Sequence, residues 1–272
     1  MRRYAQMFQR LHQRGEGAFG GFLMLGDPDV ETSATLLDAL VEGGVDMVEV
    51  GIPFSDPVAD GPVIQAAADR ALKAGVRVDD CFALIAQFRS KHPAVPVGIL
   101  TYANLLAARG RDRFMADAAA AGADSILVAD VPSIEAEPYA AAAKAAGLDL
   151  VMIAAPNTPE SVISRIAALS SGYTYCVARA GVTGTRDKLA LDHDRLFGLL
   201  QDAGAPPPVL GFGISTPDQV AEALASGAAG VIAGSALVKL GADATALRTL
   251  VSDMKRATAL PTEQREQYGH FA

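Results

Sequence analysis

Eight short apolar segments alternate along the chain with segments of helical periodicity, and this alternation restricts the possible folds more than any other feature. The apolar segments are 21–25, 47–50, 95–100, 125–129, 150–154, 174–178, 208–212 and 230–233. Alternating strands and helices predict a parallel sheet, because a parallel neighbour is reached through a crossover that usually contains a helix. Eight strands favour a closed (β/α)8 TIM barrel over the alternative, an open doubly wound sheet.

The length of the chain is compatible with a single barrel. A barrel domain has about 250 residues, and this chain has 272 residues, half of them hydrophobic. No linker rich in proline, glycine or serine divides the sequence, so a single domain over 1–272 is expected. An extra N-terminal helix over 4–14 is expected to cap the closed end of the barrel. Thr158 and Thr216 each precede a proline and an acid, a pattern that predicts a helix N-cap.

Charge and cysteine content argue against several classes of protein. The 31 acidic and 23 basic residues give a net charge of -8, and no cluster of lysine and arginine indicates binding to nucleic acid or to an anionic membrane. No apolar run reaches the roughly 18 residues of a membrane span. Two cysteines, Cys81 and Cys176, are too few for a disulfide framework and favour a reducing compartment. We therefore expect a cytoplasmic protein with small-molecule ligands.

Glycine-rich loops follow the last three predicted strands, at 180–185, 211–215 and 233–236. Barrel enzymes bind substrate at the carboxyl ends of their strands, and a phosphate commonly lies after strands seven and eight. Glycine lets backbone N–H groups approach an anion closely, and a helix that begins at Ser235 would add further donors. Each loop alone could be only a tight turn. Together the three loops predict a site for the phosphate of a small substrate.

The remaining residue types point to carboxylate chemistry. The four histidines are scattered and expected to be solvated, and the lysines miss the inward positions that a Schiff base requires, so no metal site or covalent amine is expected. Glu49 shares a strand face with Met47, and an apolar barrel mouth would raise the pKa of its carboxyl and favour proton transfer. Asp60 lies in a proline-framed loop, where polar surroundings would keep it ionised. A solvated edge residue, or a partner for an arginine, is the alternative for Glu49.

Several motifs together resemble the α subunit of tryptophan synthase along nearly the whole chain. They include G-A-F-G-G-F-L-M-L-G-D-P-D, V-E-V-G-I-P-F-S-D-P-V-A-D-G-P, L-V-A-D-V-P, G-F-G-I-S and G-S-A-L-V-K. This resemblance implies a barrel enzyme that cleaves indole-3-glycerol phosphate to indole and glyceraldehyde 3-phosphate in tryptophan biosynthesis. It implies no cofactor in this chain and a pyridoxal-phosphate-dependent β subunit as partner, in an α2β2 heterotetramer.

The resemblance also implies roles for individual residues. Glu49 matches the acid that protonates the indole ring carbon, and Asp60 matches the carboxylate that binds the indole N–H. Tyr175 matches a phenol in the site. The matching phosphate ligands are Gly184, Gly213, Gly234 and Ser235. The implied substrate pocket consists of Phe22, Ile64, Leu100, Leu127, Ala129, Ile153, Thr183 and Phe212.

Other segments are assigned by the same resemblance. Segment 181–191 is expected to close over substrate as a lid. The residues expected to face the β subunit are Pro53, Asp56, Pro57, Tyr102 and Asn104. Ala178 departs from the serine of many relatives, and the polar tail 261–272 has no match. Two other functions stay open: another sugar-phosphate barrel enzyme, and a non-catalytic barrel that binds a phosphorylated ligand and activates a partner.

Overall fold

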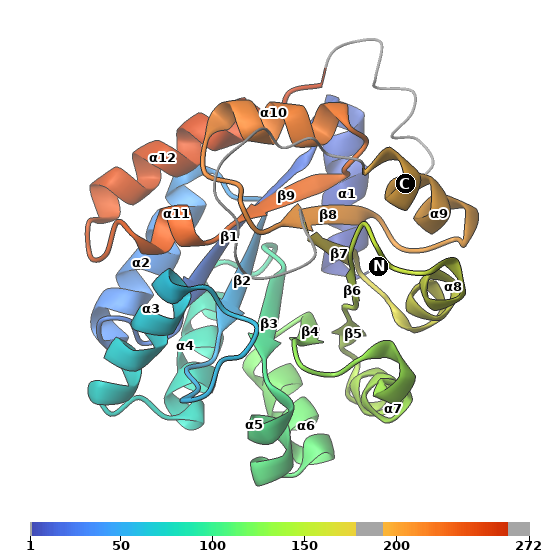
Figure 1. Cartoon of the computed structure of the whole chain (residues 1–272). Coiled ribbons are helices and arrows are strands. Elements are labelled where there is room, and N and C mark those ends of the chain that lie inside the picture. Colours follow the sequence, from blue (N-terminus) through green and yellow to red (C-terminus); the bar gives the residue numbers. More distant parts are fainter. Residues whose placement is uncertain (1, 178–192, 261–272) are drawn as a thin grey trace.

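The computed structural model describes residues 2–177 and 193–260, and Figure 1 shows its parallel strands surrounded by helices. The strands are β1 (Ala18–Met24), β2 (Met47–Gly51), β3 (Val97–Thr101), β4 (Ser125–Val128), β5 (Asp149–Leu150), β6 (Ile153–Ala154), β7 (Thr174–Val177), β8 (Pro208–Gly211) and β9 (Gly230–Ala233). Every strand pair in the sheet is parallel. Each predicted apolar segment therefore overlaps a strand, and segment 150–154 overlaps two, β5 and β6.

The barrel closes through residues 149–154, where the sequence predicted a single strand over 150–154. The order in the sheet is β5-β4-β3-β2-β1-β9-β8-β7-β6, so β5 and β6 lie at its two ends. Between them, the Val151 amide donates to the Ile126 carbonyl at 2.9 Å, and the Tyr175 amide donates to the Met152 carbonyl at 3.0 Å. The chain from β5 to β6 thus hydrogen-bonds to both edges of the sheet. The nine strands occupy eight positions of a closed (β/α)8 barrel, as predicted.

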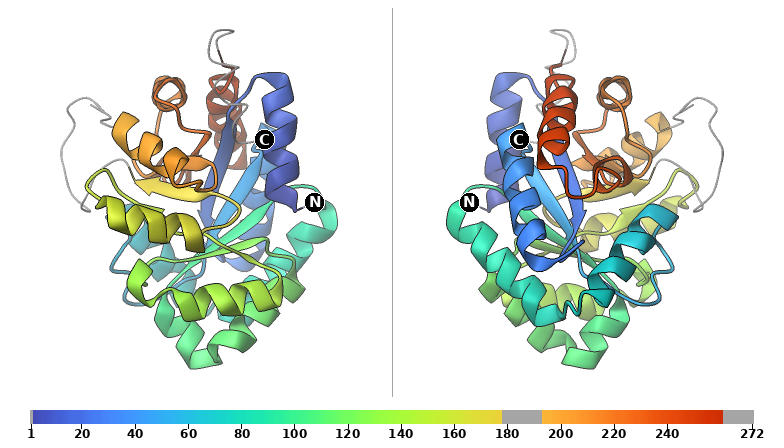
Figure 2. Two further views of the ribbon diagram at one scale, coloured as in Figure 1. Left: turned by 90° about the vertical axis from the view of Figure 1, so that its right-hand side faces the viewer. Right: turned by 90° about the vertical axis from the view of Figure 1, so that its left-hand side faces the viewer.

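The helices cover the outside of the barrel, as both views in Figure 2 show. They are α1 (Arg3–Arg14), α2 (Val30–Gly43), α3 (Pro62–Lys73), α4 (Val78–Lys91), α5 (Ala103–Arg109), α6 (Arg111–Ala121), η1 (Ser133–Glu135), α7 (Glu137–Ala146), α8 (Glu160–Leu169), α9 (Asp194–Asp202), α10 (Pro217–Ala225), α11 (Ser235–Val238) and α12 (Ala244–Arg256). In the part of the chain that the structure describes, no helix is long and apolar enough to cross a membrane.

Helix α1 closes the amino-terminal end of the barrel, as the sequence predicted. The Tyr4 hydroxyl lies 2.9 Å from the Ser125 hydroxyl, and Ser125 is the first residue of β4. A Cβ atom at Gly98, near the start of β3, would lie 2.9 Å from the Tyr4 hydroxyl oxygen and 2.8 Å from that of Ser125. Glycine at this position therefore leaves the space that the two hydroxyls occupy. With this end filled, the opposite end is the one that can hold a site.

The two predicted helix N-caps have different outcomes. Thr216 caps α10: its hydroxyl accepts from the Gln219 amide, and the Gln219 side chain accepts from the Thr216 amide, which completes a capping box. For Thr158 the prediction is wrong, because α8 begins at Glu160 with Pro159 as its N-cap. The Thr158 hydroxyl instead accepts from the Ala155 amide at 2.9 Å, so the preceding turn uses the group that would have capped the helix.

Candidate active site

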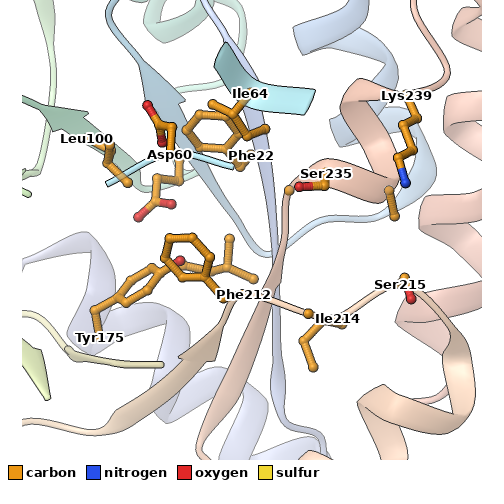
Figure 3. Close-up of a pocket in the computed structure, with 15 residues that line it drawn as sticks. Phe22, Asp60, Ile64, Leu100, Tyr175, Phe212, Ile214, Ser215, Ser235 and Lys239 are labelled. Carbon is orange, nitrogen blue, oxygen red and sulfur yellow. The ribbon is translucent and has the colours of Figure 1, made fainter. Parts of the chain in front are cut away.

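A pocket of about 260 Å³ opens at the carboxyl ends of the strands (Figure 3). Its lining combines two chemically different ends. Apolar and aromatic side chains form one end, namely Phe22, Ile64, Leu100, Tyr175 and Phe212. Ser215, Ser235 and Lys239 lie together at the other end, which is polar. Glu49 and Asp60 also line the pocket, and the apolar residues surround Asp60 in Figure 3. The pocket is therefore suited to an elongated ligand with one flat apolar end and one polar end.

Glu49 is buried in the centre of β2, where its side chain is largely removed from water. It pairs in register with Phe22 on β1 and with Gly98 on β3, and only 3 % of its surface is exposed. Burial raises the pKa of the Glu49 carboxyl to about 8, a hydrogen bond from the Tyr173 hydroxyl opposes that rise, and the nearby Asp60 charge adds to it. Glu49 is therefore mostly protonated near neutral pH. Its strand period had predicted this apolar environment correctly.

Asp60 lies in the loop between β2 and α3, but its surroundings differ from those expected. Its exposed fraction is 7 %, so it is buried rather than solvated, and burial raises the pKa of its carboxyl. The Tyr102 hydroxyl donates a 2.8 Å hydrogen bond to Oδ2 of Asp60, and this contact opposes the rise. One neighbouring phenol, rather than a polar loop, thus favours the ionised carboxylate.

Tyr175 and Phe212 form the aromatic wall opposite Asp60 (Figure 3). Their rings meet edge to face, with centroids 6.0 Å apart. A Cβ atom at Gly211 would lie 2.0 Å from the Tyr175 hydroxyl oxygen, so only glycine fits beneath this phenol. Phe212 has φ of 64°, a left-handed conformation that is costly for an aromatic residue. The turn after β8 accepts this strain and places the Phe212 ring in the pocket.

The polar end contains three of the four predicted phosphate ligands and one residue that the sequence analysis missed. Gly213, Gly234 and Ser235 line the pocket there, whereas Gly184 lies outside the described residues. Lys239 lines the same end, and no ion pair of its ammonium group is found within the described ranges. From the sequence, Lys239 was excluded only as a Schiff-base amine, because it misses the barrel positions from which a side chain points inward. One feature of the sequence could have indicated its place: Lys239 follows Ser235 by four residues, about one helical turn, so the two side chains lie on the same side of that turn.

The other predicted pocket residues lie elsewhere. Ala129 and Ile153 line a separate hollow together with Asp130, beyond the carboxyl ends of β4 and β6. Leu127 is buried in β4 and lines neither of these two pockets. Thr183, the proposed lid 181–191, Ala178 and the tail 261–272 lie outside the described residues.

The segments assigned to a partner surface divide into exposed and buried residues. Asp56 and Asn104 are exposed and Pro57 is partly exposed, whereas Pro53 is buried. Tyr102 is only 1 % exposed and contacts Asp60 rather than solvent. The predicted surface thus combines exposed positions with two buried residues, one of which, Tyr102, contacts the pocket residue Asp60.

The histidines do not all have the predicted solvated positions. His193 is fully buried, and its Nε2 lies 3.2 Å from the Val177 carbonyl oxygen. His92 lies 2.8 Å from Asp38. Over 2–177 and 193–260, no group of three or more histidine, cysteine or acidic residues is placed to hold a metal ion.

Comparison with known proteins identifies a family. The family model for the tryptophan synthase alpha chain matches residues 8–267. Tryptophan synthase alpha chains of Shewanella amazonensis and Escherichia coli are 50 % and 47 % identical to this chain. Both alignments cover 95 % of this chain, and they cover 100 % of the Shewanella chain and 99 % of the Escherichia coli chain. A structure of Mycobacterium tuberculosis tryptophan synthase superposes with a TM-score of 0.86 at 33 % identity, covering 96 % of this chain and 99 % of that one. The structure of tryptophan synthase subunit alpha from Legionella pneumophila superposes with a TM-score of 0.83 at 31 % identity, covering 95 % of this chain and 98 % of that one.

Proposed function

The chain belongs to the tryptophan synthase alpha chain family, and from this premise we propose how its own residues bind and cleave the substrate. It is a lyase of tryptophan biosynthesis. The family's reaction breaks the carbon-carbon bond of indole-3-glycerol phosphate that joins the indole ring to the glycerol chain. The reaction requires no cofactor in the alpha chain, and pyridoxal phosphate belongs to the β subunit.

The substrate is proposed to lie along the pocket with its indole ring among Phe22, Leu100 and Tyr175, and its phosphate at the opposite end. One observation supports this orientation above all: two buried carboxyl groups line a pocket whose other end is polar and cationic. Indole-3-glycerol phosphate has the same division, with a flat apolar ring at one end and a dianion at the other. A triose phosphate has no apolar ring, so an enzyme that binds it does not require an apolar end of this size.

The two carboxyl groups have different proposed tasks. Protonated Glu49 donates its proton to the indole carbon that carries the glycerol chain, which places positive charge on the ring. Ionised Asp60 accepts a hydrogen bond from the indole N–H and stabilises that charge. The Glu49 carboxylate then takes the proton of the adjacent glycerol hydroxyl as the carbon-carbon bond breaks. The bonding electrons return to the ring, the hydroxyl carbon becomes an aldehyde, and Glu49 is protonated again.

The phosphate is proposed to bind through backbone amides of Gly213, Gly234 and Ser235, the Ser235 hydroxyl and the Lys239 ammonium group. Amides at glycine turns and at a helix start are good donors to a dianion. Lys239 adds a full positive charge to a site that otherwise offers only dipoles. Because Glu49 and Asp60 lie at the far end, the phosphate can orient the substrate without contacting the reacting carbon.

The β subunit is the expected partner, and its contact surface is also a proposal. The relatives of known structure include a tryptophan synthase from Mycobacterium tuberculosis. We place the contact at segments 53–57 and 102–104, where Asp56 and Asn104 are exposed. An α2β2 heterotetramer in the cytoplasm is the proposed assembly.

An indole assay tests the proposal directly. The purified chain is incubated with indole-3-glycerol phosphate, with and without a β subunit, and indole and glyceraldehyde 3-phosphate are quantified. Equal amounts of the two products are expected under at least one condition. A parallel incubation with triose phosphates should show no interconversion. Isomerisation without indole formation would instead support a sugar-phosphate isomerase, and binding of substrate without any cleavage would support a non-catalytic barrel.

A further inference from the structure

Tyr102 contacts the loop that contains Asp60 in three places. It is the residue immediately after β3 and the N-cap of α5. Its hydroxyl donates to Oδ2 of Asp60 at 2.8 Å and accepts from the Ala59 amide at 3.3 Å. Its ring is stacked on Phe54, with centroids 5.2 Å apart. A side chain from one barrel unit is therefore attached to both halves of the loop that follows the neighbouring strand.

These contacts leave one oxygen of Asp60 available. Other groups hold its backbone: the Gln65 side-chain amide donates to the Asp60 carbonyl at 2.8 Å, and the Asp60 amide donates to the Pro57 carbonyl at 3.2 Å. Tyr102 holds Oδ2, and no hydrogen bond to Oδ1 is found among residues 2–177 and 193–260. Because a carboxylate has one rotatable bond beyond Cβ, fixing Oδ2 also fixes the direction of Oδ1. Oδ1 is then free to accept from a ligand.

The hydroxyl also acts on the charge of Asp60. Burial favours the neutral carboxylic acid, and the Tyr102 hydrogen bond favours the carboxylate. The other titratable groups that face this pair are Glu49 on β2 and Tyr175 on β7, and Asp130 after β4 acts on Tyr102. Glu49 and Asp130 are acids and Tyr175 is neutral near neutral pH, so none of the three favours an ionised Asp60. Tyr102 is therefore the contact in this group that opposes its protonation.

We propose that Tyr102 is a positioning residue for the lyase reaction, and that its hydroxyl orients Asp60 and keeps it ionised for the indole N–H. The inference depends on the proposed function, because it assigns the task of Asp60 to the carboxylate that Tyr102 holds. It also replaces the expectation that Tyr102 faces the β subunit. Asn104, two residues further on, is exposed and remains available for that surface.

The decisive variant is Tyr102→Phe, which retains the ring that packs on Phe54 and removes only the hydroxyl. We expect kcat to fall by about tenfold, as for the loss of one hydrogen bond to a charged group. KM should change little, and the acidic limb of the kcat/KM profile should move to higher pH by about half a unit or more. Tyr139→Phe on α7, whose ring lies against Arg111 outside the pocket, is the matched control and should behave as the parent protein.

A double-mutant cycle separates positioning from packing. Asp60→Asn alone should lower kcat by at least about tenfold, as for the loss of a modest electrostatic contribution. In the Asp60→Asn background, Tyr102→Phe should cause no further loss beyond about twofold, because the hydroxyl then has no carboxylate to act on. Binding of glycerol 3-phosphate should be unchanged in every variant, which checks that the polar end of the pocket remains folded.

Three results would overturn the inference. Parent-like kcat and pH profile in Tyr102→Phe would show that the hydroxyl has no such task. A full additional loss in the Asp60→Asn background would show that Tyr102 acts independently of Asp60. Parent-like turnover by Asp60→Asn would remove the proposed task of Asp60 itself, and with it the reason for positioning. The last result can be distinguished from the first two because it is measured on Asp60→Asn alone, without the Tyr102 variant.

Discussion

The Tyr173 hydroxyl donates a 3.1 Å hydrogen bond to Oε1 of Glu49 from the side of the barrel that α1 closes. The Tyr173 ring lies 5.3 Å from that of Tyr4, which anchors α1 to the barrel through Ser125. The Glu49 side chain is buried, and this hydroxyl is its one hydrogen-bond partner within the described ranges. Glu49 is thus held in a dry site in which its neutral form is favoured, as a proton donor requires.

Removal of the acid should abolish cleavage without disturbing binding. Glu49→Gln has almost the same size and retains an oxygen that can accept from Tyr173, but it cannot donate a proton to the indole ring. We expect kcat to fall by at least about a thousandfold, and the affinity for glycerol 3-phosphate to be retained. Steady-state indole release and equilibrium binding measure the two effects. The control is Glu222→Gln on the exposed face of α10. Near-normal turnover by Glu49→Gln would refute the acid assignment.

The pH dependence of kcat/KM should be bell-shaped. The reaction needs ionised Asp60 and protonated Glu49. Burial raises the pKa of Asp60, so the rate should rise with pH through an acidic limb that lies above the ordinary range of an aspartate. Burial raises the pKa of Glu49 to about 8, so the rate should fall again as pH increases past 8. Rates measured from pH 5 to 10 at constant ionic strength test this shape. A rate that continued to increase up to pH 10 would contradict a protonated Glu49.

The same burial predicts how the stability of Glu49→Gln depends on pH. The carboxyl loses its proton near pH 4.5 in the unfolded chain but only near pH 8 in the folded protein. The stability associated with the neutral buried acid is therefore complete below pH 4.5 and is lost as pH rises to 8. Glutamine does not titrate. Relative to the parent protein, Glu49→Gln should become more stable with increasing pH, by on the order of 2 to 4 kcal/mol near pH 8.

Urea unfolding of both proteins at pH 5, 6.5 and 8 measures this change. The difference in unfolding free energy between variant and parent should widen steadily across the series. A constant difference would mean that Glu49 is ionised in the folded protein throughout this range.

Lys239 should contribute to substrate binding rather than to the chemical step. Lys239→Gln removes the cation from the polar end of the pocket, which lies away from Asp60 in Figure 3. We expect KM to rise by about tenfold with kcat changed less than about threefold, because a charge-assisted contact to phosphate is lost equally from the ground and transition states. The effect should diminish at high salt. Lys144→Gln on α7 serves as the control. A fall in kcat at unchanged KM would assign Lys239 a different task.

Local patterns were sufficient for much of the site. Glu49 follows Met47 by one strand period, so its inward direction could be read from the alternation of β2. Gly213, Gly234 and Ser235 follow predicted strands directly, which places them at the carboxyl end of any parallel barrel. Thr216 caps its helix because Gln219, which completes the capping box, lies only three residues further along the chain. Thr158 had a similar local sequence, and there a competing turn used the hydroxyl.

The environment of Asp60 could not be predicted in this way. Its loop is rich in proline and acids, which suggested polar surroundings, yet Asp60 is buried and contacts a tyrosine 42 residues away in the sequence. Lys239 was missed for a related reason. Lys239 directly follows α11, outside the strands, and its long side chain extends to the pocket from there. The periodicity of the strands gives no information about side chains that come from helices.

The sequence by itself determined the order of strands and helices, the end of the barrel that holds the site, and the inward direction of Glu49 on its strand. Those properties depend on periodicity, glycine and proline, which act within a few residues. Only the tertiary structure decided that 149–154 closes the ring, that Tyr102 holds Asp60 and that Lys239 joins the polar end of the pocket. Each of these depends on residues that are far apart in the chain lying close together, and they do so only once the barrel has closed.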